Sequence, residues 1–158
     1  MPEDDNVFPN LTVEDNLRLS IRDRKPTQSE ALERALTTFP DLKVAYKRLA
    51  GTLSGGQKQM LAVASVLVAQ PLLMLIDEPS KGLSPLFVER LGDVLEGLRG
   101  TTSVVLVEQN FYLASRVGDR FVLLDDGKTV LAGEMQQLVA SADLQQRYLG
   151  IRVASGED

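Results

Sequence analysis

The chain contains neither cysteine nor histidine among its 158 residues. The absence of cysteine excludes a disulfide framework and thiolate catalysis, and the absence of both residue types excludes a Cys/His zinc site. Without histidine there is also no Ser-His-Asp triad and no imidazole general base. Any chemistry must therefore use carboxylates, hydroxyls or amides, or groups that a partner supplies.

Positive charge and long apolar runs are also scarce. The 17 basic residues against 22 acidic ones give a net charge of -5, so nucleic acid is not expected as a partner. The longest apolar stretch, Leu61 to Ala69, is interrupted by Ser65 and is far shorter than the roughly 20 residues of a membrane span. The acidic start, Met1 to Asp5, is unlike a signal peptide. These features predict a cytoplasmic protein of about one ordinary domain.

The first third of the chain is predicted to be helical and to lack strands. The stretch Thr12 to Asp15 fits a capping box, so a helix is expected to begin near Val13. Ser29 is expected to cap a second helix, in which apolar residues recur at helical spacing. Pro40 and the charged segment after it are expected to end that helix.

The rest of the chain is predicted to be α/β. The apolar run Leu72 to Ile76 has the length of a strand and the unbroken apolar character of a parallel strand buried on both faces. Together with a following helix and a second apolar strand it forms a βαβ unit. In this unit the helix is expected at Leu86–Leu98 and the second strand at Ser103–Val107. A further helix is expected before the first strand, at Lys58–Ala69. After the unit, a hairpin is expected at Phe121–Ala132 and short helices at Met135–Leu149.

A glycine-rich turn precedes the first of these helices. Ser54 can cap the helix, while Gly55 and Gly56 leave backbone N–H groups unobstructed. Because a helix N-terminus presents roughly half a positive charge and several unpaired donors, this turn can bind an anion such as phosphate. Taken alone, an ordinary Ser-Gly-Gly helix start is the simpler interpretation.

Two carboxylates, Asp77 and Glu78, end the predicted strand. They lie at the end where ligands bind in open α/β sheets, and adjacent strand residues point in opposite directions, so the two can do different work. Asp77 is suited to hold Mg²⁺ through water. Glu78 is suited to orient or deprotonate an attacking water, which typically contributes about 10² to 10⁴ in rate. A solvated acidic turn before Pro79 is the alternative.

Considered together, these motifs resemble the ATP-binding cassette (ABC) ATPases. The stretch that matches the signature motif of that family letter for letter comprises Leu53, Ser54, Gly55, Gly56 and Gln57. Leu72 to Asp77 with Glu78 resembles the Walker B strand and catalytic glutamate of the family. The residues at the D-loop position are Ser80, Lys81, Gly82, Leu83 and Ser84. Gln109 falls at the switch position, which histidine usually occupies.

The flanking sequence resembles one group of these ATPases. The similarity is to the ATP-binding subunits of branched-chain amino acid importers, and it covers Val7 to Leu17, Val107 to Asn110 and Tyr148 to Gly150. The ATP-binding subunits of urea-type importers are similar as well. The resemblance implies an α/β fold, a partial P-loop NTPase core with a helical subdomain at the N-terminus. Residues 1–70 would hold the helical subdomain and the signature motif, and residues 71–158 the C-terminal part of the ATPase core.

The resemblance also implies a function and partners. The chain would belong to a subunit that binds and hydrolyses ATP with Mg²⁺ to power import of branched-chain amino acids or related small solutes. In the family two cassettes meet head to tail, so Leu53 to Gln57 would bind ATP in trans, Asp77 would hold Mg²⁺, and Glu78 and Gln109 would be catalytic. The implied partners are a second cassette ATPase, as a homo- or heterodimer, and a transmembrane permease docked near Asn6 to Asn10. The chain would contact the membrane only through the permease, peripherally on the inner face of the plasma membrane.

Three departures from the family pattern modify these expectations. No G-x-x-x-x-G-K-S/T occurs in the 158 residues, so the chain resembles the C-terminal portion of a cassette and is expected to have little or no ATPase activity alone. Gln109 can donate a hydrogen bond but cannot carry positive charge or accept a proton. Ser84 replaces the usual D-loop aspartate. Without the P-loop strand, unpaired sheet edges are expected, which oligomerisation, strand swapping or rearrangement would cover.

Two other functions are open at this point. One is a non-catalytic, truncated module that binds a permease or a cassette partner without turning over ATP. The other is an ABC-type DNA-repair or chromosome ATPase, which shares a similar signature and Walker B. The net charge of -5, the lack of sustained heptads and the stretch Phe8 to Leu17 argue against this last alternative.

Overall fold

The computed structural model describes residues 7–21 and 26–150. Asn6, where the loop assigned to permease docking begins, lies outside these residues. The chain divides into two compact units, Met1–Val107 and Glu108–Asp158, and each is described by itself. The boundary at residue 70 that the sequence suggests falls inside the first unit and remains a prediction.

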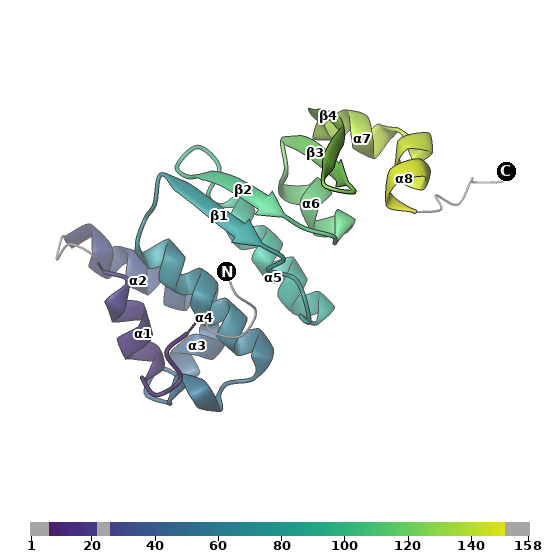
Figure 1. Ribbon diagram of the computed structural model, residues 1–158. Helices are drawn as coiled ribbons and strands as arrows, with labels where there is room; N and C mark the ends of the chain where they lie inside the picture. The colour runs from purple at the N-terminus through teal and green to yellow at the C-terminus, as the bar shows by residue number, and fades with distance from the viewer. Residues whose placement is uncertain (1–6, 22–25, 151–158) are drawn as a thin grey trace, which may run out of the picture. The chain divides into compact units, whose positions relative to one another are not determined.

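The N-terminal part of the first unit is a cluster of helices around α4. The helices are α1 (Val13–Leu19), α2 (Pro26–Thr38), α3 (Pro40–Val44) and α4 (Gly55–Val68), with a 3₁₀ turn η1 (Ala50–Thr52) before α4. Helices α1, α2 and α3 all contact α4 (Figure 1). Apolar side chains from these helices form a closed core in which the most deeply buried are Val13, Leu17, Phe39, Leu42, Leu61 and Val68. Burial of each such side chain contributes about 1.5–3 kcal/mol.

The observed helix starts confirm one predicted helix boundary and correct two others. Helix α1 begins at Val13 as predicted, because the Thr12 hydroxyl accepts a hydrogen bond from the Asp15 N–H at 3.1 Å. The prediction that Ser29 caps the second helix is wrong, since α2 already begins at Pro26. Pro40 does not simply end a helix either, because it occupies the first turn of α3. Proline suits this position, where its missing N–H would have no partner and its φ is already helical.

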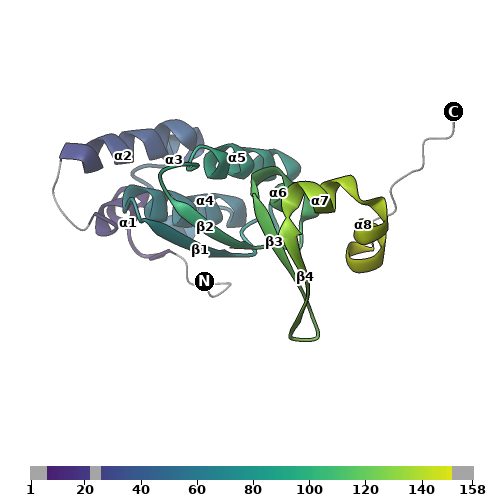
Figure 2. The ribbon, with the colours of Figure 1, turned by 90° about the horizontal axis from the view of Figure 1, so that it is seen from above.

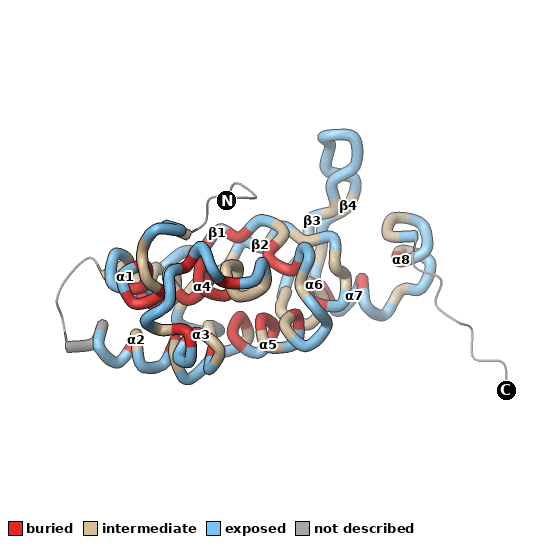
Figure 3. Tube along the Cα trace, turned by 90° about the horizontal axis from the view of Figure 1, so that it is seen from below, coloured by how far each residue is buried: buried red, intermediate tan, exposed pale blue. Residues whose placement is uncertain are grey.

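The central part of the first unit is a βαβ unit. Strand β1 (Leu73–Asp77) leads through α5 (Pro85–Glu96) to β2 (Ser103–Val107), and the two strands pair in parallel with Leu75 opposite Val105. Helices α4 and α5 lie on the same side of the strands (Figures 1 and 2). Figure 3 shows buried residues concentrated on α1, α4 and α5.

The prediction that β1 is buried on both faces is wrong. Met74 and Ile76 are 3% and 4% exposed, whereas Leu73 and Leu75 on the opposite face are 54% and 68% exposed. The reason is that the helices of the unit cover one face of the sheet. The apolar run therefore correctly indicates a strand, but only one of its faces packs within the described structure.

The second unit contains a hairpin with helices before and after it. Its elements are α6 (Phe111–Val117), β3 (Arg120–Asp125), β4 (Lys128–Glu134), α7 (Met135–Ala140) and α8 (Ala142–Leu149). The predicted hairpin is confirmed, and Asp126 and Gly127 at its tip have φ of 46° and 70°, as a type I′ turn requires. Helix α6 was not predicted, although the Asn110 side chain caps it by accepting from the Leu113 N–H at 3.2 Å.

Candidate nucleotide-binding site

The signature turn is seated at the N-terminus of α4. Leu53 is buried, and the two side chains that follow form a reciprocal capping box. The Gln57 N–H donates to Ser54 Oγ at 3.3 Å, while the Ser54 N–H donates to Gln57 Oε1 at 3.1 Å. This box explains why α4 begins at Gly55, three residues before the Lys58 that the sequence suggested.

The two glycines of the turn keep the helix start open. A Cβ placed on Gly55 would meet no atom within 4 Å, so the space beside its backbone is unfilled by the chain. The N–H groups of Gly55 and Gly56 occupy the first helical positions, where no acceptor exists within the helix. Together with the helix dipole, these donors make an arrangement suited to an anionic oxygen such as a phosphate oxygen.

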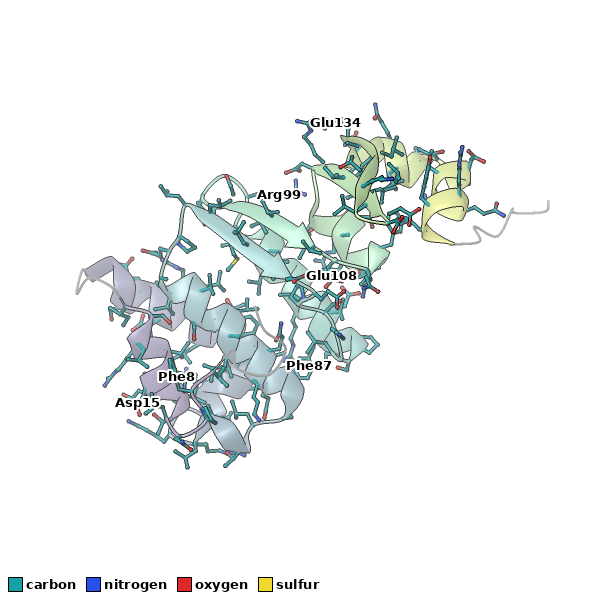
Figure 4. All side chains as sticks on the ribbon, in the orientation of Figure 1. Phe8, Asp15, Phe87, Arg99, Glu108 and Glu134 are labelled. Carbon is teal, nitrogen blue, oxygen red and sulfur yellow. The ribbon has the colours of Figure 1, made fainter. Side chains whose placement is uncertain are left out.

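The structure brings the D-loop position against this turn. A Cβ on Gly56 would lie 3.3 Å from Phe87 Cδ2 and 3.4 Å from Leu83 Cδ2, so the side chains after β1 pack directly on the glycine (Figure 4 labels Phe87). The same side chains line a small apolar cavity together with α4 residues such as Met60 and Val63. Glycine at position 56 therefore serves packing as well as access to the backbone.

The D-loop segment itself is a tight turn. The Lys81 N–H donates to the Glu78 carbonyl at 3.2 Å, and the Leu83 N–H donates to the Ser80 carbonyl at 3.0 Å. Gly82 has a φ of +72°, which an L side chain rarely adopts. Ser84 then occupies the N-cap position of α5 with extended backbone. These constraints hold the five predicted D-loop residues in one compact turn.

The two candidate catalytic carboxylates stand at the end of β1. Asp77 is exposed and is the last strand residue, paired with Val107. Glu78 leaves the strand with a φ of +44°, and its N–H donates to the Val107 carbonyl at 2.8 Å. Its side chain is 30% exposed, and its Oε2 lies 3.7 Å from Lys81 Nζ. A non-glycine residue held in the left-handed region costs about 1–3 kcal/mol, and such strain clusters at functional sites.

The carboxylates fit the way proteins hold Mg²⁺ beside a nucleotide. Within the described residues no group of three or more acidic side chains could cage a metal by itself. Mg²⁺ in nucleotide sites, however, takes one or two carboxylates and completes its shell with phosphate oxygens and water. A single exposed aspartate at a strand end satisfies that requirement, so Asp77 can serve as the protein ligand.

The remaining predicted site residue, Gln109, belongs to the second unit. It is exposed and immediately follows Glu108, whose Oε2 accepts a hydrogen bond from the Asn110 N–H at 3.0 Å. The signature turn, the D-loop turn and the carboxylates thus share the first unit, whereas Gln109 is described with α6.

Sequence reasoning missed Asn16, a buried polar residue in α1. It is 4% exposed; its Oδ1 accepts from the Phe8 N–H at 2.7 Å, and its Nδ2 donates to the carbonyls of Phe8 at 3.0 Å and Thr12 at 2.9 Å. These bonds fix the loop before α1 while the Phe8 side chain stays 61% exposed (Figure 4). The sequence signal that could have identified Asn16 is its polar amide next to Leu17, on the apolar side of the predicted helix.

A comparison with known families identifies the chain. Residues 1–81 match the family model described as ABC transporter. The chain belongs to the ABC transporter family. Within residues 7–21 and 26–150, no helix combines the length and the apolar character that crossing a membrane requires.

Curated relatives and solved structures agree with this assignment. The high-affinity branched-chain amino acid transport ATP-binding protein BraG of Pseudomonas aeruginosa is 39% identical over 154 residues, 95% of this chain and 65% of the relative. The probable branched-chain amino acid transport ATP-binding protein LivF of Archaeoglobus fulgidus is 38% identical, over 96% of this chain and 65% of the relative. This ABC chain thus spans 65% of the length of both relatives.

Among solved structures, the ATP binding subunit of an ABC transporter matches with a TM-score of 0.74 at 25% identity, covering 94% of this chain and 60% of that one. A dimeric ATP-binding cassette in a post-hydrolysis state with ADP and Pi matches with a TM-score of 0.70 at 25% identity, covering 82% and 59%. The predicted family and the predicted fold class, a partial P-loop NTPase core, are confirmed. Proteins of this ABC family bind ATP, generally with Mg²⁺.

Proposed function

We propose that this chain is part of an ATP-binding subunit that powers import of branched-chain amino acids or related small solutes through an ABC transporter. One observation carries the proposal. A complete signature sequence, Leu53 to Gln57, starts the exposed end of α4 in a chain that is 39% identical over 95% of its length to BraG.

The local geometry supports a proposed role for each site residue. The N–H groups at Gly55 and Gly56, with the Ser54 hydroxyl, bind the γ-phosphate of an ATP whose other contacts come from a second cassette. Asp77 would be the protein ligand of Mg²⁺, and the ion would supply neutralisation of phosphate charge when bound. Glu78 orients the attacking water and accepts its proton. The Gln109 amide donates a hydrogen bond to a phosphate oxygen without contributing charge.

The proposed partners are the second cassette and a transmembrane permease. The permease would dock on the helical region, near the loop that Asn16 holds in front of α1. The chain would then sit on the inner face of the plasma membrane and reach the membrane only through that permease. No nucleic acid partner is proposed.

For the isolated 158-residue chain we expect little or no ATP hydrolysis, because the sequence contains no G-x-x-x-x-G-K-S/T to cradle the phosphates. This observation favours a second candidate function, a non-catalytic module that offers its signature turn to a partner cassette. Robust ATP hydrolysis by the purified chain that disappears in Glu78→Gln would contradict the expected inactivity.

A mixed-dimer experiment tests the proposed site. The chain is combined with purified full-length BraG and a non-hydrolysable ATP analogue, and the complexes are measured by light scattering. We expect a mixed dimer that requires the nucleotide, and in Gly55→Glu an affinity at least about tenfold lower because a carboxylate would occupy the phosphate position. Gly97→Glu is the matched control, since Gly97 is exposed at the end of α5 and has an ordinary φ of -62°. A mixed dimer that forms without nucleotide, or that Gly55→Glu leaves intact, would refute the assignment.

A further inference from the structure

Arg90 on α5 contacts two other side chains of the first unit at once. Its Nη1 donates to Oδ2 of Asp41 on α3 at 3.1 Å. Its guanidinium carbon lies 5.7 Å from the centre of the Phe87 ring, which is within the roughly 6 Å at which a cation attracts an aromatic face. The side chains of Arg90 and Asp41 are 33% and 40% exposed, so both are partly shielded from water. The ion pair therefore joins α3 to α5 and also restrains the Phe87 ring.

The Phe87 ring reaches the backbone of the signature turn. A Cβ on Gly56 would lie 3.3 Å from Phe87 Cδ2 and 3.4 Å from Phe87 Cε2, so one edge of the ring lies against this glycine. Phe87 also lines the small apolar cavity beside α4, together with Phe39 and Leu91. Because a void leaves part of the ring without packing partners, the contact with Arg90 supplies a restraint that the core does not.

The signature turn needs restraint from outside. A phosphate site made of backbone N–H groups works only when those groups are held within about 0.5 Å of the productive geometry. Glycine has more backbone freedom than any other residue, and the turn contains two in succession, Gly55 and Gly56. The capping box between Ser54 and Gln57 holds the helix start from within. The contact of Phe87 with Gly56 holds it from the side of α5.

We propose that Arg90, held by Asp41, is a positioning residue of the signature turn. It orients the Phe87 ring, and the ring holds Gly56 so that the N–H of that glycine points to the place of the phosphate oxygen. Arg90 itself touches no nucleotide in this arrangement. The effect on ATP rests on the proposed function, whereas the effect on the turn rests only on the contacts within this chain.

Residue-resolved amide hydrogen exchange of the isolated chain tests the effect on the turn. The Gln57 N–H bonds Ser54 Oγ at 3.3 Å and the Lys58 N–H bonds the Ser54 carbonyl at 2.9 Å, so both report on the helix start. Arg90→Met removes the cation and is expected to speed exchange at both amides at least about threefold, the size expected of a partly exposed ion pair. Asp41→Ala should act alike, and the double variant should exceed neither single one, because the two residues act as a unit.

Two controls separate this effect from a general loss of stability. Arg34→Met removes an exposed arginine that pairs with Glu30 on the same helix at 3.8 Å, and it should leave the amides of the turn unchanged. The Asp15 N–H, which bonds Thr12 Oγ1 at the start of α1, should exchange at the wild-type rate in every variant. Equally faster exchange at Asp15, or wild-type rates at the turn in Arg90→Met, would overturn the proposal.

The nucleotide-dependent mixed dimer with BraG measures the consequence for the site. Arg90→Met is expected to lower its affinity at least about threefold. Phe87→Leu should also lower it, and adding Arg90→Met to Phe87→Leu should have no further effect, because the arginine acts through the ring. An unchanged affinity in Arg90→Met, or fully additive losses, would overturn the proposal. If the wild-type chain forms no mixed dimer, the proposed function fails, and the exchange rates alone decide whether Arg90 holds the turn.

Discussion

The helical region α1–α4 and the β1/β2 sheet of the same unit are packed to very different degrees. In the helical region Leu17, Leu42 and Leu61 are fully buried. In the sheet, Leu75 is 68% exposed although it belongs to an equally apolar stretch. The helical region buries its apolar side chains among its own helices, whereas only one face of the sheet is covered. Apolar sequence alone does not distinguish a residue that stabilises this chain from one that is available to a partner.

Truncation of one leucine in each region tests this contrast most strongly. Leu61→Ala removes a fully buried side chain and is expected to lower the free energy of unfolding by about 2–5 kcal/mol, because it leaves a cavity at the centre of the helical region. Leu75→Ala is expected to change it by no more than about 0.5 kcal/mol, since the side chain is already largely in water. Urea unfolding monitored by circular dichroism measures both. Equal losses would show that the face of the sheet that carries Leu75 is covered in solution.

A second test concerns the polar part of the helical core. Asn16→Ala leaves the N–H and carbonyl of Phe8 without their side-chain partner and is expected to cost about 1–3 kcal/mol in the same unfolding assay. Asn10→Ala, an exposed asparagine in the same loop, is the matched control and should leave stability nearly unchanged. If both variants behave alike, the helical region does not depend on this buried amide.

The same contrast explains how far the sequence could predict the structure. Local signals were sufficient where they act within a few residues, as at the Thr12 cap and the Asp126-Gly127 turn. The parallel strand pair was predicted from a different signal, the order strand, helix, strand along the chain. Proline was misinterpreted at Pro40, because the residue both ends one helix and starts the next. The exposure of Leu75 could not be predicted, since burial depends on which elements cover a strand and the pattern of one strand carries no such information.

The candidate site also contains features that the sequence could predict and features that it could not. The signature residues and Glu78 could be selected from sequence because their spacing matches a family pattern. The packing of Gly56 against Leu83 and Phe87, and the left-handed backbone of Glu78, were not predictable, since both depend on contacts between elements that are separated in the chain. The role of Asn16 was missed for a similar reason, because its partner Phe8 lies eight residues earlier in an irregular loop.

A third prediction compares the caps of the two helices that flank β1. Ser54→Ala removes the capping box of α4 and is expected to lower stability by about 1 kcal/mol. Ser84→Ala is the matched change at the N-cap of α5, whose serine makes no side-chain capping bond, so a smaller loss is expected. Thermal unfolding distinguishes the two variants. A larger loss of stability for Ser84→Ala would mean that α4 depends less on its N-cap serine than α5 does.

The smallest expected effect is a pH dependence at the surface of the helical region. The Thr12 hydroxyl donates to Asp15 Oδ2 at 2.5 Å, and this bond, more than the nearby charges of Arg18 and Lys47, lowers the pKa of Asp15 below its ordinary value of 3.8. Figure 4 labels Asp15, which lies in the first turn of α1. A carboxyl whose pKa is lower in the folded state stabilises the fold above its ordinary pKa. That contribution disappears as the pH falls from 3.8 through the lowered value.

Asp15→Asn should therefore be slightly less stable than wild type at neutral pH and should approach it in acid. Urea unfolding of both proteins across this pH range measures the difference. Thr12→Ser retains the hydroxyl and should keep the pH dependence, whereas Thr12→Ala should reduce it, because the hydroxyl is the largest cause of the lowered pKa. A difference between Asp15→Asn and wild type that stays constant with pH would show that Asp15 acts through the charge-independent geometry of the helix start and not through its ionised carboxylate.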